Sequence, residues 1–452
     1  MHATVKPLEL HILGYEVPLA PRPLARALVA EVRDMPVALQ AWFGLLLAVI
    51  AVAAIAAVVA IPPGWEVFGT SPSFEWGLMI IGYVFFAIMT SGLCLASSLG
   101  TVFGIERFLP LEKRHAVLAI LSLSTAFLII ALDLHYPVRM VFGAVLVPSP
   151  SSPMWWMGVF YGVYLVVLVV EVWTLFTNHP KIHQYACASA AVIAVCAPFT
   201  LGAVFGVLGA KAFWDGIFTP ITMIASAFLA GTSLLAIVFY FVHRLRLADH
   251  ERAAPIALPS IRLLMAIGLA VVGALLVRLI AVGLGSDNRG MHEATAALVT
   301  GPLAAAFWLR VIAGLVAPAV MIAMPIRRRP ETMLAAGVLG LTGILVDRYL
   351  FVAAGQIAPQ TAGAGTLSYP FASYAPSIIE IAIFAGAAAL MAFLYTLAER
   401  YLDMGESDVH TFFAWPWLKE HLHHDDEAAG PATEVVQDEV AAASRVAEGA
   451  RG

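Results

Sequence analysis

The sequence contains ten long, predominantly apolar stretches, separated by segments that carry Pro, Gly and charged residues. An α-helix rises 1.5 Å per residue, so roughly 20 apolar residues cross a bilayer core about 30 Å thick. Each stretch therefore predicts a membrane-spanning helix. The stretches are residues 38–61, 76–104, 115–136, 154–177, 184–208, 217–243, 259–284, 303–325, 332–355 and 374–399.

The composition supports this interpretation for the chain as a whole. Hydrophobic residues make up 61% of the sequence and charged residues only 12%, whereas an ordinary soluble domain is about 25% charged. This excludes a soluble enzyme, a nucleic-acid-binding protein and a disordered scaffold. We predict an all-α polytopic membrane protein, in which spans two to five and spans six to nine form two four-helix bundles with flanking helices.

Lys and Arg residues in the short loops predict the orientation, because cytoplasmic loops are enriched in them. Fourteen fall in the N-terminal segment and the loops on its side, and three, Arg139, Lys211 and Arg289, fall in the alternate loops. Both termini are therefore expected to be cytoplasmic, in a bacterial inner membrane. We expect a cytoplasmic segment over 1–37 with an interfacial helix at 22–34, a transmembrane domain over 38–400 with bundles at about 76–208 and 217–355, and a largely disordered cytoplasmic tail over 401–452.

Ionisable residues inside the spans form a second pattern. Each costs about 2.5–3.5 kcal/mol on insertion scales, so each needs a partner or a function. One set lies in the outer third of the later spans, and we interpret it either as structural ion pairs, such as Arg310 with Asp347 or Arg278 with Glu380, or as a proton path. Glu171 lies nearer the cytoplasmic end of span four and is assigned to the same path. The outer set is Arg278, Arg310, Asp347, Arg348 and Glu380.

The outer end of the third span carries Asp133 and His135, with Arg139 just beyond it. A carboxylate two residues from an imidazole can exchange protons with solvent and hydrogen-bond a carbonyl group. We therefore predict catalytic roles for Asp133 and His135. Tyr83, deep in the second span, needs a polar partner for its hydroxyl group.

The cysteines of this chain form no metal-binding pattern. The three cysteines, Cys94, Cys187 and Cys196, lie in apolar runs and form no CxxC pair. We therefore expect no iron–sulfur cluster, no haem and no structural metal in this chain. Five tryptophans near outer ends predict an aromatic belt at the membrane surface: Trp65, Trp76, Trp155, Trp156 and Trp214.

Three groups of motifs carry a family resemblance. Residues 75–92 begin Glu-Trp-Gly and end Ser-Gly, residues 132–139 read LDLHYPVR, and Asp347-Arg348-Tyr349-Leu350 precedes Pro376-Ser377-Ile378-Ile379-Glu380. These segments resemble the NrfD/PsrC family, the membrane subunits of polysulfide-reductase-type complexes, which are related to those of alternative complex III. The resemblance covers roughly residues 75–400. It departs at His135 and Tyr136, which replace Gly-Arg of the family turn LDLGRPxR, and at Asp347, where Asn or Glu is commoner.

This resemblance implies a quinone-interacting subunit of a respiratory oxidoreductase. Menaquinone or ubiquinone would bind near the outer face among Tyr83, Asp133, His135 and Arg139. Electrons would pass between the quinone pool and a periplasmic, ferredoxin-like iron–sulfur subunit, itself attached to a molybdopterin-type or cytochrome catalytic subunit. The metals would belong to those partners.

Other functions are compatible with ten spans. A secondary transporter would carry Gly/Pro-broken helices in matching halves. A b-type cytochrome anchor would hold haem between two histidines at one depth. A purely structural anchor for a periplasmic complex would bind no quinone.

Overall fold

The computed structural model describes residues 9–12, 15–18, 35–60, 67–105, 112–134, 147–177, 179–245, 250–323, 330–357 and 373–402, with 33, 108, 109 and 404. Within them, ten helices are long and apolar enough to cross a membrane, and the predicted spans are confirmed. The helices are α2 (Val37–Ala60), α3 (Leu78–Thr101), α4 (Glu112–Asp133), α6 (Pro153–Thr177), α7 (Pro180–Gly206), α8 (Phe218–Arg244), α9 (His250–Leu284), α13 (Pro330–Ile357) and α14 (Ile378–Tyr401), while α11 (Ala304–Leu309), η2 (Arg310–Val316) and α12 (Ala317–Ala323) form the eighth span.

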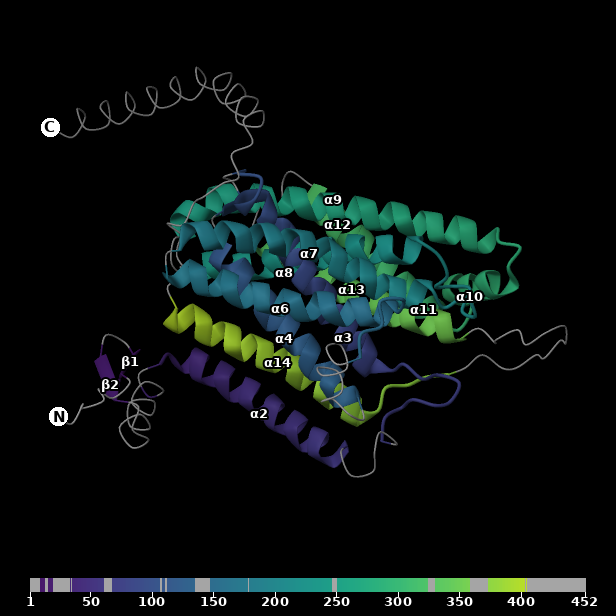
Figure 1. Ribbon diagram of the computed structural model, residues 1–452, viewed down its shortest axis with the longest axis horizontal. Helices are drawn as coiled ribbons and strands as arrows, with labels where there is room; N and C mark the ends of the chain where they lie inside the picture. Colours follow the sequence, from purple (N-terminus) through teal and green to yellow (C-terminus); the bar gives the residue numbers. More distant parts are fainter. Residues whose placement is uncertain are drawn as a thin grey trace, which may run out of the picture.

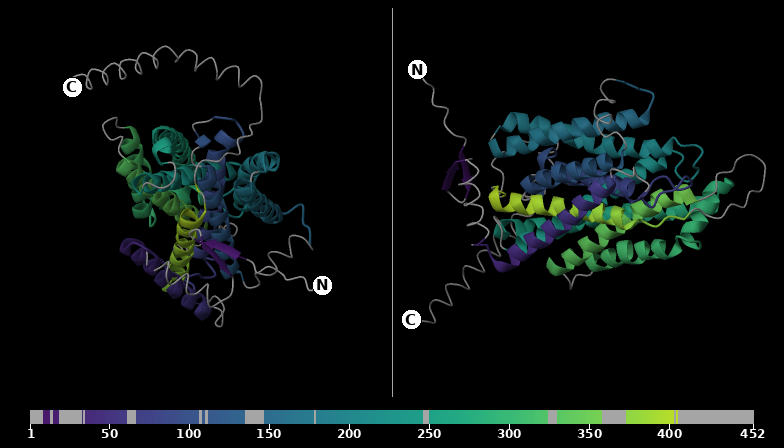
Figure 2. Two further views of the ribbon diagram at one scale, coloured as in Figure 1. Left: turned by 90° about the vertical axis from the view of Figure 1, so that its left-hand side faces the viewer. Right: turned by 90° about the horizontal axis from the view of Figure 1, so that it is seen from below.

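The helices pack as two bundles with two flanking helices. Helices α3, α4, α6 and α7 form the first bundle, and α8, α9, α13 and the eighth span form the second. Helices α2 and α14 pack against each other, and α14 also packs against α4, so this pair covers one side of the molecule (Figures 1 and 2). The predicted all-α polytopic fold is confirmed.

Helix α3 lies at the joint between the bundles and is buried along nearly its whole length. Its Gly92 lies directly against Ala227 and Gly231 of α8, where a Cβ atom on either glycine would overlap the backbone of the other helix. The two bundles are therefore joined by contact between backbones. By contrast, α2 exposes Val52, Ile55 and other large apolar side chains, as expected for a helix that faces lipid.

The eighth span is interrupted by η2, a π-helical segment of seven residues. Such segments are rare and occur frequently at functional sites. Gly314 in η2 lies against Gly343 of α13, where an added Cβ atom would meet the opposite Cα atom at 2.5 Å. This close approach brings Arg310, the first residue of η2, alongside α13.

Two elements lie outside the predicted spans. Strands β1 (Glu9–Ile12) and β2 (Tyr15–Pro18) pair as an antiparallel hairpin. Helix α10 (Arg289–Val299) lies between the seventh and eighth spans, and the side chain of Asn288 caps its first turn. The interfacial helix predicted over 22–34, Arg33 apart, and the tail beyond residue 404 lie outside the described residues.

Helix α2 begins, and α14 ends, at one end of the molecule (Figure 1). We call this the inner end and the opposite end the outer end, following the predicted orientation.

Candidate functional site

At the outer end, Glu380 holds several chain segments together. It lies in the first turn of α14, where Ser377 and Glu380 form a reciprocal capping box. Its Oε2 atom accepts hydrogen bonds from the backbone nitrogens of Gly69 (2.8 Å) and Ser377 (2.8 Å). Its Oε1 atom accepts from the Tyr374 hydroxyl group (2.7 Å) and the Leu78 nitrogen (3.2 Å). The fully buried carboxylate therefore fastens the segment before α3 to the start of α14.

Tyr374 is part of the same arrangement. Its ring stacks on Phe74 with centroids 4.7 Å apart. Burial raises the pKa of Tyr374, and the hydrogen bond that its hydroxyl group donates to Glu380 raises this pKa further. The hydroxyl group therefore stays a donor well into the alkaline range.

The predicted quinone-site residues are only partly described. Asp133 is the last residue of α4 and is half-buried, within electrostatic range of Glu380. Tyr83 is buried in α3, and its ring meets that of Tyr161 of α6 edge to face, with centroids 6.4 Å apart. In the described part of the chain, no hydrogen bond joins Tyr83 to Asp133. His135 and Arg139 lie outside the described residues.

An aromatic cluster beside this end connects the two bundles. Trp214 stacks on Trp76 (centroids 5.2 Å apart) and donates a hydrogen bond to the Phe351 carbonyl group (2.8 Å). Trp214 is 1% exposed, so the prediction that it belongs to a membrane-surface belt is wrong. Gln356, which no sequence pattern singled out, accepts from the Trp76 nitrogen (2.9 Å) and donates to the Trp76 carbonyl group (3.1 Å).

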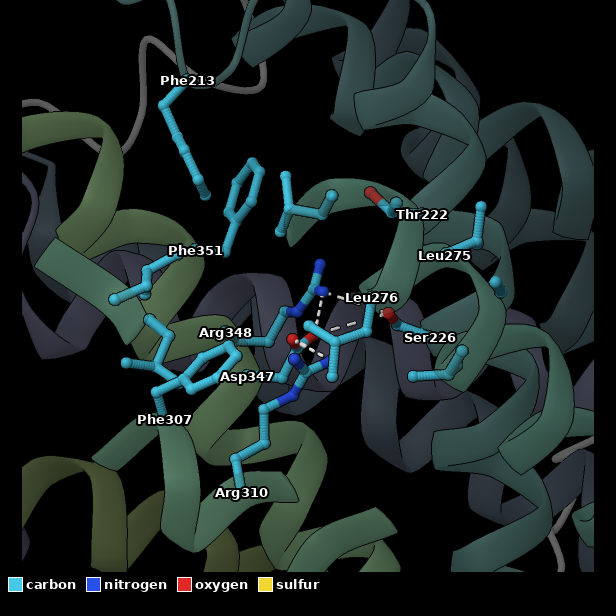
Figure 3. Close-up of a pocket in the computed structure, with 15 residues that line it drawn as sticks. Phe213, Thr222, Ser226, Leu275, Leu276, Phe307, Arg310, Asp347, Arg348 and Phe351 are labelled. Atoms are coloured by element: carbon cyan, nitrogen blue, oxygen red, sulfur yellow. Dashed lines mark hydrogen bonds and ion pairs between the residues drawn. The ribbon is translucent and has the colours of Figure 1, made fainter. Parts of the chain in front are cut away.

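The second bundle contains a buried cluster of Arg310, Asp347 and Arg348 (Figure 3). Nη2 of Arg310 lies 2.6 Å from Oδ1 of Asp347, so this predicted ion pair is confirmed. The neighbouring Arg348 pairs with Oδ2 of the same carboxylate and donates to the Ser226 hydroxyl group (3.0 Å). One carboxylate therefore serves two guanidinium groups. The predicted partnership of Arg278 with Glu380 is wrong, because the Arg278 guanidinium lies over the Phe218 ring, 3.0 Å from its centroid.

A cavity of about 70 Å³ opens beside this cluster, lined also by Thr222, Leu276, Phe307 and Phe351 (Figure 3). One water needs about 10–15 Å³ by this kind of measure, so the cavity accommodates a few water molecules. Drug-sized ligands occupy pockets of roughly 300–1,000 Å³. The cavity is therefore suited to water rather than to a quinone ring.

Glu171 lies near the inner end of the first bundle, in a buried cluster with residues of α4 and α7. Its Oε1 atom is 3.8 Å from the thiol of Cys187, which also contacts His183. His183 in turn contacts Glu112 at the start of α4. The sequence does give one sign of this cluster: His183 and Cys187 are four residues apart, a spacing that places two side chains on the same face of a helix.

Comparisons with known proteins agree with this architecture. The family model described as "Polysulphide reductase, NrfD" matches residues 66–360. The chain belongs to the NrfD family. The NrfD match begins before α3 and ends after α13, so it covers both bundles and leaves α2 and α14 outside.

Two relatives of this NrfD chain show how far the similarity extends. It is 26% identical over 331 residues to an Hdr-like menaquinol oxidoreductase integral membrane subunit of Archaeoglobus fulgidus, covering 69% of this chain and 80% of the relative. It is 20% identical over 425 residues to a selenate reductase subunit of Mesobacillus selenatarsenatis, covering 84% of this chain and 98% of that protein.

Proposed function

We propose that this chain is the quinone-interacting membrane subunit of a quinol-linked oxidoreductase in a bacterial inner membrane, with both termini cytoplasmic. Family membership supports the proposal, as does the name of the Archaeoglobus relative, a menaquinol oxidoreductase subunit. Electrons pass between menaquinone or ubiquinone and a ferredoxin-like iron–sulfur subunit docked at the outer end. That partner connects to a molybdopterin-type or cytochrome catalytic subunit.

The quinone ring binds at the outer end of the first bundle, among Tyr83, Asp133, His135 and Arg139. Quinol oxidation releases two protons and two electrons, so the site needs a proton acceptor beside an electron exit. The observation that carries the assignment is the contrast between Glu380 and Asp133, which lie at the ends of two neighbouring helices, α14 and α4. Glu380 already accepts four hydrogen bonds, whereas Asp133, in the described part of the chain, has no hydrogen-bond partner and is half-buried.

Of these two carboxylates, Asp133 is therefore the one that can accept a proton and release it to solvent. We assign His135 as the group that takes the proton from the quinol hydroxyl, with Asp133 orienting its ring and Arg139 favouring the ionised form of Asp133. Tyr83 donates to a quinone carbonyl group from inside the bundle.

A proton path through the second bundle is centred on Asp347. The carboxylate borders the cavity of about 70 Å³, where a short chain of water can form. Arginine does not give up its proton at ordinary pH. Arg310 and Arg348 are therefore positioning residues that hold the Asp347 carboxylate in place. Glu380 has a similar role for the segment before α3.

Site-directed variants of the assembled complex test the quinone site. We expect Asp133→Asn and His135→Ala each to lower quinol oxidation about 100-fold or more, because general acid–base groups contribute about 10²–10⁴ in rate. The matched control is Asp287→Asn, which removes an exposed carboxylate from a loop at the same end. Retention of turnover within about twofold by an assembled Asp133→Asn, His135→Ala double variant would refute the assignment.

A further inference from the structure

The inner end of the first bundle brings together side chains from three helices that share the chemistry of metal ligands. Glu112 begins α4, His183 and Cys187 lie one turn apart on α7, and Glu171 lies on α6. All four are buried, with exposed fractions of 2–4%. One donor atom each from Glu112, His183 and Cys187 lies within 4.8 Å of the other two.

The spacing of these donor atoms fits a single tetrahedral ion. Bond lengths to zinc predict edges of about 3.3 Å between nitrogen and oxygen and about 3.6 Å between sulfur and either of them. Nε2 of His183 lies 2.9 Å from Oε1 of Glu112 and 3.3 Å from Sγ of Cys187. The fourth residue, Glu171, brings Oε1 to 3.8 Å from the same sulfur. The two distances from His183 need only a small adjustment to surround an ion, and the Glu171 carboxylate must move closer to complete the set.

The groups around these donors also resemble the surroundings of a metal site. A ligating histidine almost always hydrogen-bonds through its second ring nitrogen, which fixes the orientation of the ring. Nδ1 of His183 lies 3.1 Å from the Thr174 hydroxyl group, which is itself anchored to the Glu171 carbonyl. This leaves Nε2 directed at Glu112 and Cys187.

Two carboxylate oxygens in the cluster lack compensation. Among the described residues, Oε2 of Glu112 and Oε2 of Glu171 have no hydrogen-bond partner, although both atoms are buried. A buried charge is strongly unfavourable unless it is paired or coordinates a metal. A divalent cation between the carboxylates would give both of these oxygens a partner.

We propose that Glu112, His183 and Cys187 bind one zinc ion, with Glu171 in the fourth position. The mixed sulfur, nitrogen and oxygen donors are those that zinc takes in proteins, and a closed set of four ligands is typical of a structural site. The ion links α4, α6 and α7 at the end opposite the quinone site. This assignment gives Glu171 a ligand role in place of the proton path that the sequence suggested.

Zinc content of the purified full-length chain tests the site. All samples lack a polyhistidine tag and carry His421→Ala, His423→Ala and His424→Ala, because the tail histidines would themselves bind metal. After growth with zinc and extensive dialysis, we expect about one zinc per chain by elemental analysis. We expect Cys187→Ser and His183→Gln each to lower this value to near zero, with an unchanged elution volume in size-exclusion chromatography.

Matched controls separate ligation from general damage to the fold. Cys196→Ser changes the other cysteine of α7, and His179→Ala changes an exposed histidine just before the same helix; both should keep the zinc. Replacing zinc by cobalt gives a visible thiolate-to-metal absorption band that Cys187→Ser abolishes and Cys196→Ser retains.

Zinc below about 0.2 per chain in the parent protein, or equal zinc in the parent and in a folded Cys187→Ser, His183→Gln double variant, would overturn the proposal. Either result would leave a histidine–carboxylate ion pair as the role of the cluster. Neither result bears on quinol oxidation at the opposite end, so the two proposals stand or fall separately.

Discussion

Replacing Glu380 by glutamine tests how the outer end is held together. The carboxylate accepts hydrogen bonds from Gly69, Leu78, Ser377 and Tyr374, two on each oxygen. Glutamine has nearly the same shape but only one accepting oxygen, and its amide nitrogen is a donor. In Glu380→Gln, two of the four donors therefore lose the carboxylate as their acceptor in a site that is closed to solvent.

The size of the effect follows from this count. A hydrogen bond to a charged group contributes about 1.5–3 kcal/mol, so two lost bonds lower the free energy of unfolding by about 3–6 kcal/mol. An unfolding entropy of roughly 2.1 cal/mol/K per residue gives about 0.9 kcal/mol/K for a chain of this length. The midpoint of thermal unfolding should therefore fall by about 3–6 °C.

The assay is thermal unfolding of the purified chain in detergent, followed by intrinsic tryptophan fluorescence. The control is Glu293→Gln, because Glu293 pairs with Arg289 on the exposed face of α10, where the Arg289 side chain is 67% exposed. Such a pair contributes about 0.3–0.5 kcal/mol, so the control should shift the midpoint by less than about 1 °C. Equal unfolding midpoints for Glu380→Gln and Glu293→Gln would contradict the prediction. They would show that water satisfies the donors that Glu380 binds, and that Glu380 does not fasten the segment before α3.

Two further predictions concern charge and pH. Asp347→Asn leaves Arg310 and Arg348 buried without a carboxylate, so it should lower the free energy of unfolding by about 3–5 kcal/mol. The double variant Arg310→Met, Asp347→Leu restores the net charge of the cluster, so it should lower the free energy of unfolding by less than Asp347→Asn does. If Asp347 carries protons, Asp347→Asn also stops proton uptake by proteoliposomes that contain the complex, and uptake equal to wild type would contradict that role. Because the pKa of Tyr374 is higher in the folded chain than its ordinary value near 10, the folded state keeps a proton that the unfolded state loses, and stability declines as the pH rises above about 10. Tyr374→Phe should make this decline shallower in unfolding midpoints measured from about pH 8 to about pH 11, and parallel curves would contradict the prediction.

The membrane spans were predictable because a run of apolar residues is enough to identify each one. No knowledge of the helices that pack against it is needed. The pairing of Arg310 with Asp347 was also predictable, since the two residues lie at the same depth on successive spans. Equal depth does not specify which way a side chain faces, however. Arg278 turns to the Phe218 ring. Glu380 is fully occupied by three backbone nitrogens and the Tyr374 hydroxyl group.

Contacts between distant segments account for what the sequence did not reveal. Trp214 occupies a space that Gly355 leaves open, because a Cβ atom there would overlap the indole ring. The local sequence does not distinguish an interfacial tryptophan from a buried one, because the residue that makes room for the buried ring lies in a distant segment. The inner cluster is similar, because Glu112 and His183 are separated by 71 residues in the sequence and meet only when α4 packs near α7.

The backbone contact between Gly92 and Gly231 limits how this molecule can move. Carriers that work by alternating access rock one half against the other around a central site. Here the two halves touch without intervening side chains, so a rocking motion would drive main chain into main chain or open a void in the centre of the membrane. A change at one end of the molecule can therefore reach the other end only through side chains and water within a rigid frame.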